Sequence, residues 1–198
     1  FESLQASYTS FSKCSCFRQI SPQKKILQTM NINSVVYQTD QIRCYDGRGQ
    51  EIDCAGTGQD GDIRTGHPWP KPRFEEKNAV VKDILSGLMW TKNATPAEFP
   101  QTWGEAFEYV NRMNASCSHG YDDWRLPNIR ELESLVVLDQ HSPALPESHP
   151  FQNVGQGYWS STTSVYDTSY AWVLYSDDGK VGVGFKKKAD FGVWPVRS

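Results

Sequence analysis

The 198-residue sequence lacks any long hydrophobic run. Its longest unbroken apolar stretch runs from Tyr170 to Tyr175, whereas a membrane-spanning helix needs about 20 residues. Aliphatic residues are scarce too, since 38% of the residues are hydrophobic while 13% are aromatic. We therefore expect no membrane span, and a core built from few, large side chains on short strands.

Signatures of catalysis and of metal binding are also missing. The four histidines are never three or four residues apart and no Cys-x-x-Cys pair accompanies them, so a helical zinc site is excluded. No Gly-x-Ser-x-Gly motif supports a nucleophilic serine. The acidic clusters Asp53/Asp60/Asp62 and Asp122/Asp123 do not match the twelve-residue calcium loop, and solvated turns explain them better. We expect no enzyme, no metal and no cofactor.

The charge is distributed unevenly along the chain. The net charge is −3, but residues 39–179 carry 11 basic against 21 acidic side chains, while residues 180–198 carry five against one. This pattern excludes a uniformly basic surface, and we expect no nucleic acid partner. It leaves room for a local basic patch near the C-terminus.

The five cysteines are an odd number, so they cannot all pair within one chain. Cys44 and Cys54 bracket a segment that contains the turn step Asp46-Gly47, and a hairpin there would bring the two sulfur atoms together. We interpret them as a disulfide in an oxidising compartment; the weaker alternative is two free thiols of a cytosolic protein. The sequence identifies no partner for the remaining cysteines, Cys14, Cys16 and Cys117.

Composition and turn signals divide the chain into three segments. Residues 1–38 are rich in Ser, Gln, Lys and Asn without a regular hydrophobic period, and we expect a poorly ordered N-terminal extension. Residues 39–73 are expected to form the disulfide-stapled hairpin and a proline-rich connector. The compact domain is expected over residues 74–198. Because the chain begins at Phe1 without an initiator methionine or a leader, we expect a fragment or a processed product.

The compact segment mixes helix and strand signals. Thr102 and Glu105 form a capping box ahead of apolar residues at helical spacing, and Asn128 and Glu131 repeat that signal. Asp178-Gly179 predicts a two-residue hairpin turn. Strands are expected at 79–83, 88–90, 158–163, 170–175, 180–185 and 191–196. Strands, then two helices, then a run of antiparallel strands indicate an α+β fold.

Basic and aromatic residues near the C-terminus are the candidates for ligand binding. Strand alternation would place Lys186 and Lys188 on one face, about 7 Å apart, and with Lys180 they would suit the sulfates or carboxylates of a polysaccharide. Tyr166 and Tyr170 would stack on sugar faces. Two alternatives remain open: a charged edge strand that resists aggregation, and tyrosines that fill a core poor in aliphatic residues.

Several ordered strings between residues 40 and 198 coincide with one known family. They are Cys44-Tyr45-Asp46, residues 54–62, Ser86-Gly87-Leu88-Met89-Trp90, Gly120-Tyr121-Asp122-Asp123-Trp124-Arg125-Leu126-Pro127-Asn128, Tyr158-Trp159-Ser160-Ser161-Thr162-Thr163, Tyr170-Ala171-Trp172 and Val193-Trp194-Pro195-Val196-Arg197. In these strings the chain resembles the C-terminal domain of the Legionella collagen-like protein, the Lcl family.

The resemblance implies a C-type-lectin-like fold, with two helices packed on a twisted antiparallel sheet, in exported bacterial proteins of mostly unassigned role. It implies structural framework positions at Trp90, Trp124, Arg125, Pro127, Trp159, Trp172 and Trp194. It carries over no glycan-binding residue, because that binding depends on surface charge. The Glu-Pro-Asn, Gln-Pro-Asp and Trp-Asn-Asp strings of calcium-dependent animal lectins are absent.

Residues and resemblance together predict a non-catalytic recognition module, secreted, periplasmic or on the cell surface of a bacterium. We expect adhesin-like binding of anionic or sulfated glycans; the alternative is a protein-binding or assembly module of a surface protein. Either form is compatible with an oligomer. An oxidase of the formylglycine-generating kind, which has a related fold, would need a reactive cysteine pair in the C-terminal part, and no cysteine follows Cys117.

Overall fold

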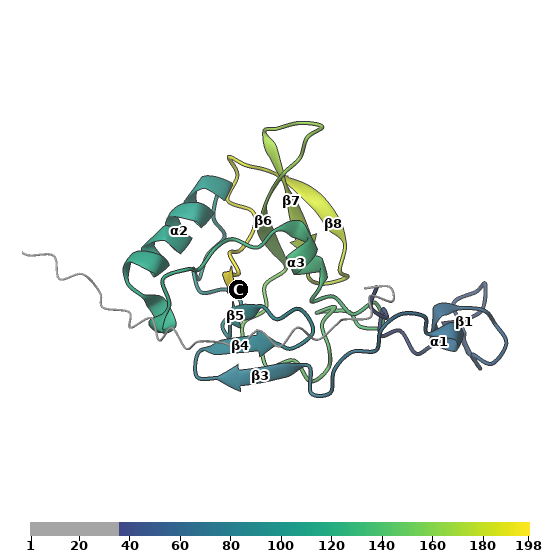
Figure 1. Cartoon of the computed structure of the whole chain (residues 1–198). Coiled ribbons are helices and arrows are strands. Elements are labelled where there is room, and N and C mark those ends of the chain that lie inside the picture. The colour runs from purple at the N-terminus through teal and green to yellow at the C-terminus, as the bar shows by residue number, and fades with distance from the viewer. Residues whose placement is uncertain (1–35) are drawn as a thin grey trace, which may run out of the picture.

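The computed structural model of the chain describes residues 36–198 (Figure 1). The poorly ordered extension expected at residues 1–38 therefore lies, up to residue 35, outside the described residues. No helix among the described residues is long and apolar enough to cross a bilayer. The described helices and strands are β1 (Cys44–Tyr45), β2 (Glu51–Ile52), α1 (Asp60–Ile63), β3 (Phe74–Lys77), β4 (Val80–Asp83), β5 (Met89–Thr91), α2 (Trp103–Ala115), the 3-10 turn η1 (Ser118–Gly120), α3 (Ile129–Glu133), β6 (Gly157–Thr163), β7 (Tyr170–Tyr175), β8 (Val181–Phe185) and β9 (Val196–Arg197).

The strands form three antiparallel sheets, which confirms the α+β class. The strand orders are β1-β2, β3-β4-β5-β9 and β6-β7-β8. The C-terminal strand β9 returns to pair with β5, so the end of the chain closes the four-stranded sheet. The β1-β2 pair and α1 form a small lobe that projects from the two larger sheets in Figure 1.

The two predicted helix starts are confirmed, but the second helix is short. The Thr102 and Asn128 side chains each accept the amide of the third helical residue, and Glu105 and Glu131 bond back to the cap amides. Helix α2 then continues to Ala115, whereas α3 ends at Glu133. Helix α3 stops because the Ser134 hydroxyl bonds back to the Glu131 carbonyl at 2.7 Å and the Ser134 carbonyl accepts a bond from outside the helix.

The sheet β6-β7-β8 separates two hydrophobic clusters. Trp159 pairs with Val173, and both pack against α2 in one cluster. The neighbouring pair, Tyr158 and Leu174, points to the opposite face and packs against α3 in the other. Since side chains alternate along a strand, two adjacent residues can serve two cores.

Three local predictions were wrong or incomplete. The Tyr175 amide donates to the Lys180 carbonyl, so the turn between β7 and β8 has four residues where two were expected. The amides of Ser142 and Ala144 donate to carbonyls of this turn and stabilise the longer form. The strand expected at 191–196 is reduced to two bridges and β9, because residues 191 and 192 pair with different neighbours. Strand β3 was not predicted, since its sequence Phe-Glu-Glu-Lys lacks apolar alternation.

Candidate ligand-binding surface

The loop between β6 and β7 carries the most exposed apolar side chains of the described chain. Val165 is 91% exposed and Tyr166 is fully exposed. The base of the loop is fixed, because the Ser164 amide donates to the Tyr170 carbonyl at 2.9 Å and the Tyr170 amide donates to the Asp167 carbonyl at 3.0 Å. The Ser169 hydroxyl and amide bond to the Asp167 carboxylate and hold its pKa below the usual range.

Lys186 is held by the fold. Its Nζ donates to the Thr163 hydroxyl at 2.8 Å and lies 3.9 Å from the centre of the Trp103 ring. Its amide donates to the Ser169 carbonyl at 3.0 Å, which joins the end of β8 to the base of the loop. Lys186 therefore ties three elements together, and its ammonium group is only partly available to a ligand.

The other two predicted lysines lie at opposite ends of β8. Lys188 is exposed and follows a turn in which its amide bonds to the Phe185 carbonyl, so the expected strand alternation ends before it. Lys180 precedes β8 and pairs with Asp178 at 2.6 Å; this hydrogen bond raises the pKa of Lys180. At about 3.3 Å per residue, the main chains of positions 180 and 186 are roughly 20 Å apart. The structure therefore joins Lys186 to the base of the loop, places the exposed Lys188 two residues further along the chain, and leaves Lys180 at the opposite end of β8.

An apolar outer face on β7 and β8 continues the surface. Tyr170 packs on Phe185 with ring centroids 5.4 Å apart, so its side chain is half-buried and fixed in position. Trp172 is 36% exposed, and its register partner Val183 is 43% exposed. The sequence did not predict this face because the Lcl resemblance placed Trp172 among the framework residues. In β8, the apolar residues Val181, Val183 and Phe185 alternate with Gly182 and Gly184, and this alternation was the available signal.

The remaining framework residues form the rigid support of this surface. Four of the predicted tryptophans are at most 2% exposed: Trp90, Trp124, Trp159 and Trp194. Arg125 makes a bidentate pair with Glu131, both bonds at 2.7 Å, and keeps the pKa of Glu131 below its usual range although burial alone would raise it. The carbonyl of buried Pro127 accepts the Ser161 amide at 2.7 Å, which fastens the segment between the helices to β6.

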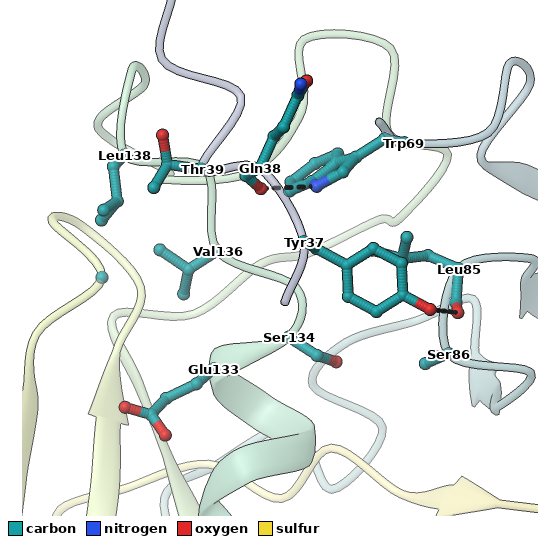
Figure 2. Close-up of a pocket in the computed structure, with 11 residues that line it drawn as sticks. Tyr37, Gln38, Thr39, Trp69, Leu85, Ser86, Glu133, Ser134, Val136 and Leu138 are labelled. Atoms are coloured by element: carbon teal, nitrogen blue, oxygen red, sulfur yellow. Dashed lines mark hydrogen bonds between the residues drawn. The ribbon is translucent and has the colours of Figure 1, made fainter. Parts of the chain in front are cut away.

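A pocket of about 330 Å³ lies at the C-terminal end of α3 (Figure 2). Residues 37–39 line one side of the pocket. Two hydrogen bonds hold this segment in place: the Tyr37 hydroxyl donates to the Leu85 carbonyl, and the Trp69 indole N–H donates to the Gln38 carbonyl. Glu133 is its one carboxylate and pairs with Arg130. The full lining is Tyr37, Gln38, Thr39, Trp69, Leu85, Ser86, Glu133, Ser134, Val136, Leu138 and Gly179. Apart from Glu133, this lining holds no Asp, Glu, His, Lys or Arg side chain.

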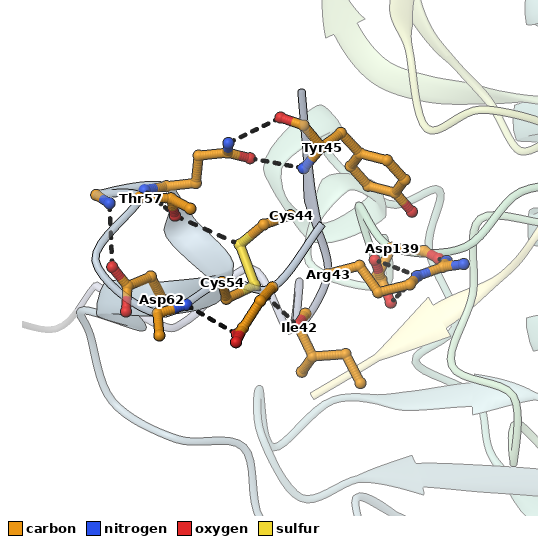
Figure 3. Close-up of a disulfide and its surroundings, with 12 residues drawn as sticks. Ile42, Arg43, Cys44, Tyr45, Cys54, Thr57, Asp62 and Asp139 are labelled. Carbon is orange, nitrogen blue, oxygen red and sulfur yellow. Dashed lines mark hydrogen bonds and ion pairs between the residues drawn. A yellow bond between two sulfur atoms is a disulfide. The ribbon is translucent and has the colours of Figure 1, made fainter. Parts of the chain in front are cut away.

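The predicted disulfide between Cys44 and Cys54 is present (Figure 3). The two Cα atoms are 5.2 Å apart and the bridge closes the β1-β2 hairpin. Arg43 links this lobe to the domain by bonding the Asp139 carboxylate at 3.1 and 3.2 Å and its carbonyl at 2.6 Å. Residues 56–61 spell G-x-G-x-x-G in this lobe, but they lead into the four-residue α1 without the βαβ unit that binds dinucleotides.

Several of the acidic residues considered for calcium accept hydrogen bonds or pair with a basic residue of the same chain. Asp60 accepts a bond from the Thr39 hydroxyl, and Asp62 accepts the Gly58 amide at 3.0 Å. Asp123 pairs with Arg197, which holds the pKa of that carboxyl below its usual range. Within residues 36–198, no three metal-ligating side chains gather.

The domain that carries this surface is similar to a known protein family. A family model described as the Lcl C-terminal domain matches residues 79–197. The chain belongs to the Lcl C-terminal domain family. This confirms the resemblance drawn from the sequence strings. The matched residues include the β6-β7 loop, the outer face of β7 and β8, Lys180 and the three lysines at 186–188. The disulfide lobe lies before the matched residues. A search of curated proteins found no match to the chain.

Proposed function

We propose that this Lcl domain is a non-catalytic recognition module that binds anionic or sulfated glycans. The observation that carries the proposal is the fully exposed Tyr166, on a loop whose fixed base is joined to the end of β8 by the bond from the Lys186 amide to the Ser169 carbonyl. The exposed Lys187 and Lys188 follow Lys186 directly in the chain. An aromatic ring stacks on a sugar face and ammonium groups meet sulfate or carboxylate groups. The proposal includes a C-type-lectin-like arrangement, in which a rigid frame supports variable loops.

The proposed binding depends on salt because its charged contacts are exposed. Coulomb attraction between surface groups is screened within about 10 Å at 0.1 M salt, so binding weakens as salt rises. The disulfide and the Lcl family membership support an exported location, namely secreted, periplasmic or on a bacterial surface.

Calorimetric titration with heparin, and with heparin stripped of its sulfates, tests the proposal. We expect binding to heparin at low salt, at least tenfold weaker binding for Tyr166→Ala and for Lys187→Glu/Lys188→Glu, and no binding to the desulfated chain. Lys180→Glu is the matched control because Lys180 lies at the far end of β8. Equal affinity for both polysaccharides, or an equal loss in the control, would contradict the proposal.

The second candidate is a protein-binding or assembly module of a surface protein. The full exposure of Val165 beside Tyr166 favours it, because adjacent exposed apolar residues are typical of interface anchors. Binding through these residues would resist high salt. A partner retained at 1 M salt and lost in Val165→Ser/Tyr166→Ser would therefore favour this candidate over the glycan.

A further inference from the structure

Strand β8 forms an open edge of its sheet. The strand order is β6-β7-β8, so β8 has a partner strand on one side only among the described residues, and Figure 1 shows it at the outside of the sheet. Two main-chain bonds fix its orientation toward β7. The Tyr175 amide donates to the Lys180 carbonyl at 2.8 Å, and the Lys186 amide donates to the Ser169 carbonyl at 3.0 Å.

These two bonds identify the groups that face away from β7. Hydrogen-bonded residues alternate along an antiparallel pair, so positions 180, 182, 184 and 186 bond to β7. The amides of Val181, Val183 and Phe185 and the carbonyls of Val181 and Val183 therefore point outward. The Phe185 carbonyl accepts the Lys188 amide, but within residues 36–198 the outward groups just named have no partner.

Strand β3, one of the two edge strands of the other large sheet, is protected in a way that β8 is not. It presents exposed Glu75, Glu76 and Lys77. Charged side chains on an edge resist pairing with another strand. Strand β8 reads Val-Gly-Val-Gly-Phe and holds no charge between its ends. Its uncharged edge, beside the exposed Trp172 and Val183, suits an added strand.

Charge at the ends of β8 indicates what that strand must carry. Lys180 precedes β8, and three lysines, at positions 186–188, follow it. A second copy paired antiparallel about Val183 would set Lys180 opposite Lys186 twice, and directly opposed like charges destabilise a pair of strands. A strand with a carboxylate at the end next to Lys187 and Lys188 would meet these exposed lysines favourably, whereas Lys180 is already paired with Asp178.

We propose that β8 binds an extended segment of another protein by β-strand addition, and that this segment has an apolar centre followed by an acidic residue at the end that lies next to Lys187 and Lys188. The outward main-chain groups of Val181, Val183 and Phe185 form the ladder. The apolar centre lies beside Trp172 and Val183. This site shares Lys187 and Lys188 with the proposed glycan surface, but its main-chain ladder on β8 does not involve the β6-β7 loop or Tyr166.

Amide hydrogen exchange on the whole chain tests the proposal, with the peptide acetyl-Glu-Val-Thr-Val-Thr-Val-Glu-amide as the probe. We expect the Val181, Val183 and Phe185 amides to exchange rapidly without peptide and at least tenfold more slowly with it. The Gly182 and Gly184 amides, which already bond to β7, serve as internal controls and should not change. A peptide with lysines in place of both glutamates should bind at least tenfold more weakly.

N-methylated peptides distinguish main-chain pairing from side-chain contact. Methylation of one alternating set of peptide amides should abolish binding, and methylation of the other set should leave it intact, because only one edge of the peptide faces β8. Equal effects of the two sets would overturn the proposal. So would unchanged exchange of the three amides at millimolar peptide, or slow exchange without peptide in a chain that sediments as a dimer. Loss of heparin binding would leave this result unaffected.

Discussion

Arg73 and Asp83 form the most buried ion pair of the described residues, and removal of Arg73 should be costly. Their side chains are 5% and 0% exposed. The Arg73 Nε and Nη2 groups donate to the Asp83 carboxylate at 3.1 and 3.0 Å, and Nη2 also donates to the Ser134 carbonyl at 2.5 Å. One guanidinium therefore joins the proline-rich connector to β4 and to the end of α3.

In Arg73→Met the Asp83 carboxylate stays buried without its cation. Breaking a buried pair in this way costs about 3–5 kcal/mol. Asp83 keeps two donors, the Leu85 amide at 3.0 Å and the Ser86 hydroxyl at 2.9 Å, so we expect the lower end of that range, about 3 kcal/mol. A loss of that size would lower Tm by roughly 6–12 °C in a domain of this length.

Urea unfolding followed by tryptophan fluorescence measures the effect as a change in midpoint at constant slope. The matched control is Arg130→Met, because the Arg130 side chain is 86% exposed and its pair with Glu133 should contribute less than about 0.5 kcal/mol. The double variant Arg73→Met/Asp83→Asn should be little worse than Arg73→Met alone. A cost below about 1 kcal/mol for Arg73→Met, or equal costs in Arg73→Met and Arg130→Met, would refute the reasoning.

Three further predictions concern the frame. In Gly184→Ala the new methyl would lie 2.5 Å from Phe191 and 2.6 Å from Trp159, so we expect a loss of about 1–3 kcal/mol in urea unfolding, whereas Gly47→Ala meets nothing within 4 Å and should be neutral. The folded state lowers the pKa of Glu131, so the ionised carboxylate stabilises the fold fully above the unfolded pKa near 4.3, and this stabilisation is lost as pH falls through the folded pKa. Glu131→Gln should therefore flatten the decline of the unfolding free energy below about pH 5. An unchanged decline would contradict this reasoning. Cys44→Ser/Cys54→Ser should expose residues 40–66 to proteolysis while the Tm of the domain stays unchanged, and a matching fall in Tm would show that the lobe and the domain unfold together.

The sequence predicted those features that depend on local chemistry. Capping boxes at Thr102 and Asn128 and the Cys44-Cys54 hairpin are set by residues within ten positions of one another, and all three are present. Arg125, a framework position implied by the resemblance, pairs with Glu131, which lies only six residues away.

Features that depend on distant pairing were missed. Strand β3 forms because it pairs with β4, which in turn pairs with β5. The sequence Phe-Glu-Glu-Lys alone does not predict this pairing. The contacts of Lys186 with Thr163 and Trp103, which lie 23 and 83 positions away along the chain, were not predicted, and its role as a ligand contact stays a prediction. Trp172 lies on the same face of β7 as the buried Leu174, so its exposure depends on how much of that face α3 covers, and this is a property of the packed domain.

The fixed base of the β6-β7 loop has a consequence for variation among such domains. Since the loop base is closed by the bonds of Ser164, Asp167 and Ser169 with their neighbours, positions 165 and 166 are free to change in identity while both clusters stay intact. A library randomised at these two positions should fold with an undiminished yield and would let one scaffold acquire many binding specificities.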